Sequence, residues 1–182
     1  LFKYDVVRIF TDLYVQAEAM GAKVIYPADE TAHLDSPAIS SIADLEKLQP
    51  PDPYKDGQLP EFLKAMEIAL AQVGKEVGVI GSITGPFTTA SFLIGTEQLS
   101  KLMIRNPEVA HKLCEIALAA NIRWADAILN TGCGVTLSDP VASSTIISPR
   151  QFREFALPYL KRLFAHLASR GKSATLHICG KT

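Results

Sequence analysis

Residues 77–86, with the sequence VGVIGSITGP, hold a short run of small and β-branched side chains that a Gly-Pro pair closes. A run of this length and composition predicts a buried β-strand over Val77–Ile83. Further runs of this kind lie on both sides of it along the chain. They are Lys23–Tyr26, Val135–Leu137 and Ala174–Cys179.

The segments around these strands carry apolar side chains at helical spacing. Predicted helices cover residues 5–20, 41–48, 60–74, 87–104 (as two short helices), 107–131 and 149–170. Strands that alternate with long helices predict parallel pairing in an α/β fold, and both a doubly wound sheet and a closed barrel fit this order. Because no glycine-rich phosphate loop follows a strand, we interpret Gly81 and Gly85 as positions of tight backbone packing.

The composition narrows the class of protein. The chain has 182 residues, of which 48% are hydrophobic and 20% charged, enough apolar content for a folded core. Its net charge of −1 provides no basic field for nucleic acid, and no apolar run approaches the length of a membrane span. Three cysteines argue against a disulfide framework and predict a cytoplasmic protein. Because the chain starts at Leu1 and stops abruptly at Thr182, we expect both ends to be truncated.

Polar residues gather where the predicted strands end. Ligands of both kinds of α/β fold bind at the carboxyl ends of the strands. This rule places Thr84, Ser138 and Asp139 at one edge of the sheet, together with His177 and Cys179 of the last strand. We expect the functional site at this edge.

Other reactive side chains are expected to be structural or solvated. Asp29, Glu30 and His33 follow the first predicted strand in a long loop, and we interpret each of them as solvated. Cys133 precedes its strand and so belongs to the opposite edge of the sheet. Cys114 lies in the middle of a predicted helix, where it serves as a small core residue.

His177-Ile178-Cys179 is the most informative triplet of the chain. Side chains alternate along a strand, so His177 and Cys179 point to one face and Ile178 to the other. An imidazole beside a thiol suits zinc, which takes nitrogen and sulfur ligands. The alternative is a buried histidine bonded to the backbone beside a packed cysteine. A catalytic zinc needs a third protein ligand, which only Asp139 or a residue beyond Thr182 could supply.

Asp139 has two interpretations of equal weight. A carboxylate at the end of a strand is suited to acid–base catalysis, metal binding or substrate binding. The same residue before a proline can instead cap the loop that follows it.

Several motifs taken together are characteristic of one family. They are Gly85–Ala90, Ser138-Asp139-Pro140, Ser148-Pro149, Pro158-Tyr159-Leu160 and Leu176–Gly180. Over nearly its whole length the chain resembles the uroporphyrinogen decarboxylase superfamily, and within it the methylcobamide:coenzyme M methyltransferases most closely. The resemblance implies a (β/α)8 TIM barrel, of which residues 1–182 form the first and middle part as a single, partial domain.

The resemblance also implies a mechanism. In the methyltransferase branch a His-x-Cys-Gly motif supplies two zinc ligands, here His177 and Cys179, and a cysteine beyond Thr182 would be the third. A thiol such as coenzyme M, or a related acceptor, would take the methyl group of a methyl-corrinoid that a partner protein carries. We expect Asp139 to be the catalytic residue of this chain. We expect substrate contacts from Thr84, Gly85, Pro86 and Ser138.

Two other functions stay open. The first is a cofactor-free uroporphyrinogen decarboxylase of porphyrin biosynthesis, with Asp139 or an aspartate expected before Leu1 stabilising a protonated pyrrole. That reaction needs arginines for the carboxylates of the substrate, and the predicted strand ends offer none. The second is a non-catalytic fragment of a barrel, which would leave the edges of its sheet unpaired.

Overall fold

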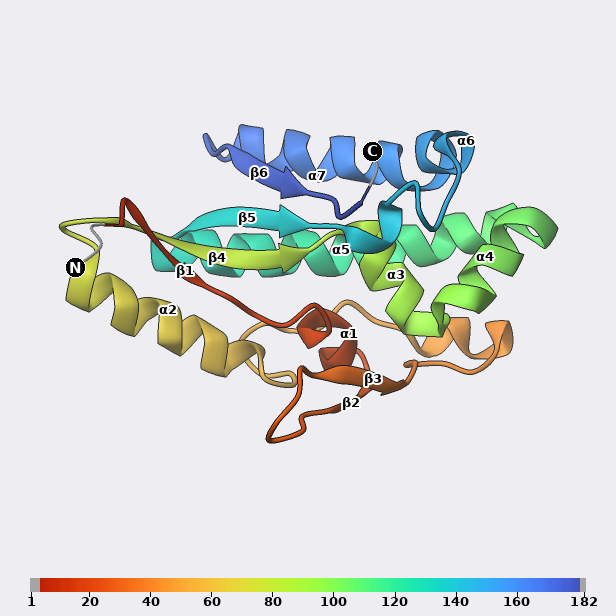
Figure 1. Ribbon diagram of the computed structural model, residues 1–182, viewed down its shortest axis with the longest axis horizontal. Coiled ribbons are helices and arrows are strands. Elements are labelled where there is room, and N and C mark those ends of the chain that lie inside the picture. Colours follow the sequence, from red (N-terminus) through yellow and green to blue (C-terminus); the bar gives the residue numbers. More distant parts are fainter. Residues whose placement is uncertain (1–3, 181–182) are drawn as a thin grey trace.

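The computed structural model describes residues 4–180, and its main feature is a four-stranded parallel sheet (Figure 1). Its strands are β1 (Val6–Ile9), β4 (Gly78–Thr84), β5 (Gly134–Ser138) and β6 (Ala174–His177). They stand in the order β1-β4-β5-β6, and every neighbouring pair is parallel. The parallel α/β fold that the sequence predicts is confirmed.

Helices connect the strands of this sheet. They are α1 (Val15–Ala19), α2 (Leu59–Val73), α3 (Pro86–Ile94), α4 (Thr96–Arg105), α5 (Pro107–Thr131), α6 (Pro149–Gln151) and α7 (Leu157–Ser169). Shorter elements are the 3-10 helices η1 (Ile42–Lys47) and η2 (Pro140–Ala142) and the π-helical turn η3 (Phe152–Ala156). None of the helices within residues 4–180 is long and apolar enough to cross a membrane.

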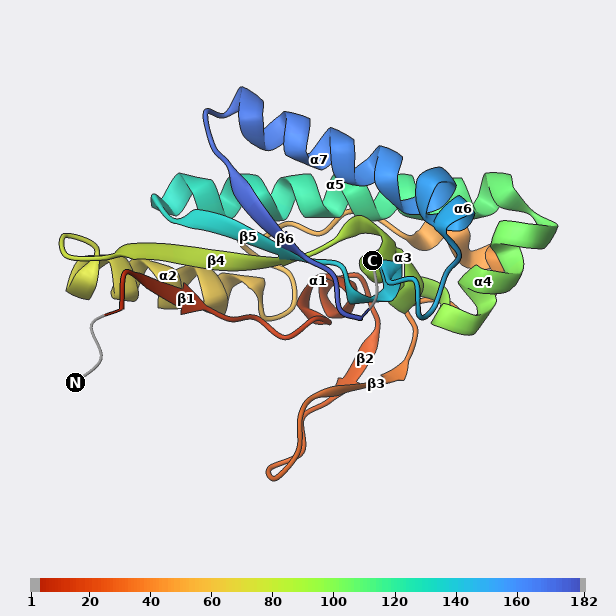
Figure 2. The same cartoon turned by 45° about the horizontal axis from the view of Figure 1, so that its top comes forward.

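The long helices cover one side of the sheet only. Figure 1 shows α5 and α7 behind the strands, and Figure 2 shows α2 behind β1 and β4; among residues 4–180 no helix crosses in front of the four strands in either view. A doubly wound sheet carries helices on both faces, whereas a barrel keeps them outside and turns its other face inward. This arrangement resolves the alternative that the order of elements left open, in favour of the barrel type.

The core lies between the sheet and these helices. Trp124 and Ile128 of α5 and Met66 of α2 are fully buried there. Trp124 Nε1 also donates a hydrogen bond to the Ser82 carbonyl oxygen at 3.1 Å. A Cβ on Gly81 would come within 2.6 Å of Met66 Cε, so the tight packing predicted for this glycine is confirmed.

The first twenty residues differ from the prediction. The helix expected over residues 5–20 is limited to α1, and Val6–Ile9 instead form the edge strand β1. A short segment with three β-branched residues, Val6, Val7 and Ile9, fits both periodicities, and parallel pairing with β4 decides the outcome. The chain then turns at Asp12, whose Oδ1 accepts a hydrogen bond from the Tyr14 N–H at 2.6 Å.

The strand predicted over Lys23–Tyr26 exists but belongs to another sheet. Residues Lys23–Ile25 form β2, which pairs in an antiparallel hairpin with β3 (His33–Ser36), a segment predicted as loop. The hairpin stands away from the parallel sheet (Figure 2). Four strands were predicted for the parallel sheet, and four are found, but the first of them is β1 and not the strand predicted over Lys23–Tyr26. Local sequence patterns do not reveal which strands pair.

Helix boundaries follow the predicted signals more closely. Helix α5 starts at Pro107 and ends before Gly132, whose φ of 99° suits glycine. Ser148 and Gln151 form a capping box at the start of α6. The single helix expected over residues 149–170 is divided, because the π-helical turn η3 separates α6 from α7 just before Pro158, which cannot donate a backbone hydrogen bond.

Candidate functional site

The residues that end neighbouring strands stand side by side. The register pairs Thr84 of β4 with Ser138 of β5, and Ser138 with His177 of β6. Beyond the strands the chain stays linked, since Gly85 N–H donates to the Ser138 carbonyl oxygen at 2.8 Å and Asp139 N–H to the His177 carbonyl oxygen at 2.9 Å. The structure therefore brings the predicted residues to one edge of the sheet, and their roles in binding or catalysis stay predictions.

Asp139 is buried beneath the start of helix α3. It is 0% exposed, and its Oδ1 accepts a hydrogen bond from the Thr88 N–H at 2.8 Å. Burial raises the pKa of this carboxyl to about 6, although hydrogen bonds from Thr88 and Phe87 oppose the shift. Within residues 4–180 its Oδ2 has no hydrogen-bond partner. The Asp139 carboxyl thus caps the start of α3, whereas the capping interpretation concerned the loop that follows the residue, and its catalytic role stays a prediction.

Gly85 is required by the position of Asp139. A Cβ on Gly85 would lie 2.4 Å from Asp139 Cγ, far inside van der Waals contact. The glycine thus lets the chain pass close to the buried carboxyl, as its predicted role in tight packing implies.

Thr84 is held by two buried side chains that the sequence analysis did not select. Gln16 bonds to both backbone groups of Thr84, with Nε2 to the carbonyl oxygen at 3.2 Å and the N–H to Oε1 at 3.1 Å. Asn121 Nδ2 donates to the same carbonyl oxygen at 2.7 Å. Since Thr84, Pro86 and Ser138 are themselves buried, they form the packed interior of the wall at this edge.

His177 and Cys179 form the exposed part of the site. His177 Nε2 lies 3.1 Å from Cys179 Sγ, and both residues are exposed. Two ligands of a tetrahedral zinc with ordinary bond lengths stand about 3.6 Å apart, so a small opening of this pair would admit the ion. The residues 4–180 contain no group of three His, Cys, Asp or Glu side chains that could hold a metal. The pair therefore fits two of the three ligands that a catalytic zinc needs.

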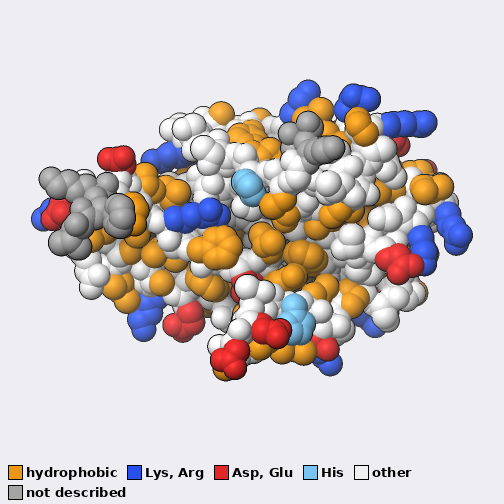
Figure 3. Space-filling view, in the orientation of Figure 1, with side chains coloured by type: hydrophobic (Ala, Val, Ile, Leu, Met, Phe, Trp, Pro, Cys, Tyr) orange, Lys and Arg blue, Asp and Glu red, His pale blue; other side chains and the backbone are white. Residues whose placement is uncertain are grey.

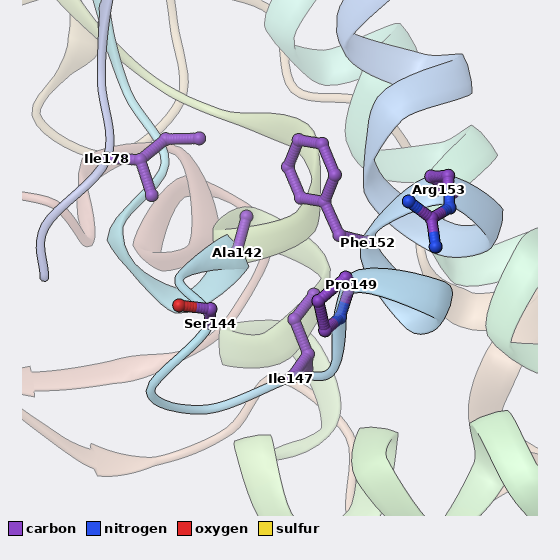
Figure 4. Close-up of a pocket in the computed structure, with 7 residues that line it drawn as sticks. All are labelled: Ala142, Ser144, Ile147, Pro149, Phe152, Arg153 and Ile178. Atoms are coloured by element: carbon purple, nitrogen blue, oxygen red, sulfur yellow. The ribbon is translucent and has the colours of Figure 1, made fainter. Parts of the chain in front are cut away.

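Ile178 points away from this pair, as strand alternation predicts. It lines an apolar cavity of about 250 Å³ together with Phe152 and Ile147 (Figure 4). Arg153 and Ser144 are the polar side chains of its lining. The residues that line this cavity do not include the candidate metal ligands His177 and Cys179.

Two residues of the edge were missed because β1 was predicted as helix. Asp12 follows β1, and its Oδ2 accepts a hydrogen bond from the Tyr26 hydroxyl at 3.2 Å. The single hydrogen of this hydroxyl is shared with Glu18, whose Oε2 lies 3.0 Å from the Tyr26 oxygen, and burial followed by the charge of Asp12 raises the pKa of Tyr26. Arg8, within β1, donates from Nε to Ser82 Oγ at 2.8 Å. The strand-end rule would have found Asp12 had Val6–Ile9 been assigned as a strand.

The remaining candidates lie as expected. Asp29, Glu30 and His33 are exposed in the β2–β3 hairpin. Cys114 is fully buried in α5, and Cys133 is buried before β5, at the other end of the sheet from Cys179.

A one-sided parallel sheet with polar residues at its carboxyl edge defines an α/β protein of the barrel type. The profile of the family described as uroporphyrinogen decarboxylase (URO-D) matches residues 1–182. The chain belongs to this family.

Its relatives include enzymes with two different names. A methylcobamide:CoM methyltransferase, MtaA, of Methanosarcina barkeri is 30% identical over 97% of this chain and 52% of its own length. A uroporphyrinogen decarboxylase of Myxococcus xanthus is 30% identical over 92% of this chain and 48% of its own length. A solved structure of a methyltransferase from Methanosarcina mazei superposes with a TM-score of 0.86 at 30% identity, over 97% of this chain and 52% of that one. The chain thus spans about half the length of the relatives it matches.

Proposed function

We propose that the protein is a corrinoid-dependent methyltransferase, which moves a methyl group from a methyl-corrinoid carried by a partner protein to a thiol such as coenzyme M. The observation that carries this proposal is the exposed His177–Cys179 pair, with 3.1 Å between Nε2 and Sγ, at the carboxyl edge of the sheet. The similarity to methylcobamide:CoM methyltransferases supports it. We further propose that residues 1–182 are a single part of one barrel domain.

His177 and Cys179 would hold a zinc ion, with a cysteine beyond Thr182 as the third protein ligand. When bound, zinc stabilises the deprotonated form of a coordinated thiol at neutral pH. A thiolate is the nucleophile that the transfer needs: its sulfur forms the new bond to the methyl carbon, and the electron pair of the broken bond stays with the corrinoid. The buried network of Asp139, Gly85 and Thr84 positions the strand ends that carry the ligand pair.

The decarboxylase is the second candidate function. The match to relatives of that name and the guanidinium of Arg8, which could bind a carboxylate, favour it. The zinc-type donor pair is the observation against it, because decarboxylation of this substrate class without a cofactor has no use for a metal.

Zinc content and product analysis of the full-length protein test these alternatives. Cys179→Ala is expected to lose bound zinc and methyl transfer from methylcobalamin to coenzyme M. The matched control Cys133→Ala changes a thiol at the other end of the sheet and is expected to keep both. Full zinc occupancy in Cys179→Ala would overturn the metal assignment. Formation of coproporphyrinogen from uroporphyrinogen would establish the decarboxylase, and the absence of both reactions would favour a non-catalytic protein.

A further inference from the structure

The uncovered face of the sheet carries an arginine that forms no ion pair with the residues the structure describes. Arg8 stands on β1, and the ion pairs of residues 4–180 do not include it. The register together with strand alternation places Arg8, Ser82 and Thr136 on the same face as His177. Figure 3 views this face, where hydrophobic side chains cover the centre and most charged ones lie along the margin.

The guanidinium of Arg8 is held on two sides. Its Nε donates to Ser82 Oγ at 2.8 Å, and Ser82 Oγ in turn lies 3.4 Å from the Ile9 carbonyl oxygen. The guanidinium carbon stands 5.0 Å from the centre of the Phe10 ring. Because Nε is occupied, the two terminal nitrogens remain as a fork, the geometry that binds a carboxylate or sulfonate with two parallel hydrogen bonds.

The neighbours of Arg8 on this face suit an anion as well. Ser82 is in register with Thr136, and Thr136 with Thr175. The hydroxyls of Thr136 and Thr175 lie 2.8 Å apart, so this row contributes hydroxyl groups and no negative charge. The interior of such a barrel is usually filled with bulky aliphatic residues, and a row of hydroxyls beside an arginine is therefore a departure that a polar ligand would explain.

The distance from the Arg8 guanidinium, which bonds to Ser82, to His177 determines how long a bound ligand must be. Ser82 and Thr175 are two strands apart, and His177 lies two residues beyond Thr175. Strand spacing of about 4.8 Å and a rise of about 3.3 Å per residue put the Arg8 fork on the order of 10 Å from a thiol held at His177.

We propose that Arg8 binds the acidic group of a methyl acceptor longer than coenzyme M, whose sulfonate is only two carbons from its thiol. Arg8 would select acceptors whose carboxylate or sulfonate lies on the order of 10 Å from the reacting thiol. This inference rests on the proposed methyltransferase function, and it names Arg8 as a residue that determines specificity.

The test compares acceptors that differ in charge and length, with methylcobalamin as the donor and the full-length protein as the enzyme. The wild type is expected to prefer 6-mercaptohexanoate over 6-mercaptohexanol by about tenfold or more in kcat/KM. The short 3-mercaptopropionate should gain much less over 2-mercaptoethanol. Arg8→Gln is expected to abolish the long-chain preference through KM, whereas Arg105→Gln, an exposed arginine at the end of α4, should retain it.

An unchanged preference in Arg8→Gln would overturn the proposal. An unchanged preference with a lower unfolding midpoint would also overturn it, and would show that Arg8 pairs with a carboxylate of the protein. Should Arg8→Gln not fold, Ser82→Ala removes the bond that orients the guanidinium; a severalfold weaker preference supports the proposal and an intact one refutes it.

A binding measurement separates this inference from the proposed function. Calorimetry with 6-(methylthio)hexanoate needs no turnover, so a loss of its affinity in Arg8→Gln supports the anion site even if no thiol is methylated. Equal affinity of wild type and Arg8→Gln for this acid would refute the site, whatever the reaction.

Discussion

Replacing Gln16 with methionine should destabilise the protein although Gln16 touches no proposed ligand. The pairing of β1 with β4 ends at Ile9 and Gly81, so the last residues of β4 have no strand partner on that side. The fully buried Gln16 amide fills this place by bonding to the N–H and the carbonyl oxygen of Thr84. A side chain thus completes the sheet at the edge that carries the site.

The cost of this change follows from the bonds that remain. In Gln16→Met the Thr84 carbonyl oxygen keeps its bond from Asn121, but the Thr84 N–H is left buried without a partner. An unsatisfied buried N–H costs about 1–3 kcal/mol, and with the second lost bond we expect a total near 2–3 kcal/mol. For a chain of this size that lowers the melting temperature by about 5–10 °C.

Urea unfolding followed by circular dichroism at pH 7 measures this loss. The matched control is Gln98→Met on the exposed side of α4, which should stay within about 0.5 kcal/mol of the wild type. If Gln16→Met were as stable as Gln98→Met, the amide would not be completing the sheet, and the reasoning would fail.

Two further predictions concern the buried carboxyl at the same edge. Gly85→Ala places a Cβ within 2.5 Å of Asp139 Cβ and should lower the free energy of unfolding, measured in urea, by about 1–3 kcal/mol. In the control Gly78→Ala the nearest atom is 3.9 Å from the new Cβ, and the loss should be less than half as large. Equal losses in the two variants would contradict the packing argument. Burial raises the pKa of Asp139 to about 6 from 3.8 in the unfolded chain, so protonation of this carboxyl stabilises the folded state. This stabilisation is fully present below about pH 4 and is lost as the pH rises through about 6. Asp139→Asn should therefore flatten the change in the free energy of unfolding between pH 4.5 and 7.5, and a wild-type slope in this variant would refute the assignment.

Local signals predicted the elements whose ends carry special residues. Pro107 starts α5, Gly132 ends it and the capping box of Ser148 opens α6, because these residues act within one turn of the helix; the Asn106 side chain makes no capping hydrogen bond to α5. The proximity of the His177 and Cys179 side chains was also predicted, from alternation along a strand over Ala174–Cys179, although β6 ends at His177 and the last two residues of that run lie beyond it.

Local sequence signals could not predict which strands pair or which polar side chains are buried. The sequence could not tell that Val6–Ile9 pair with β4 while Lys23–Ile25 pair with β3, because pairing depends on residues distant along the chain. The roles of Gln16 and Asn121 could not be predicted for the same reason. Each amide bonds to the backbone of Thr84, which is distant along the chain, so only the tertiary structure shows the contact.

The sequence by itself determined the α/β class, the order of most helices and strands, and the donor pair at the end of the last strand. These features follow from periodicity, caps and strand alternation, which are local properties of the chain. Only the tertiary structure decided that all long helices lie on one side of the sheet, that Asp139 is buried under α3, and that Arg8 faces the same side as His177. Those facts depend on contacts between distant segments, whose energies come from burial and from hydrogen bonds that no single segment can form alone.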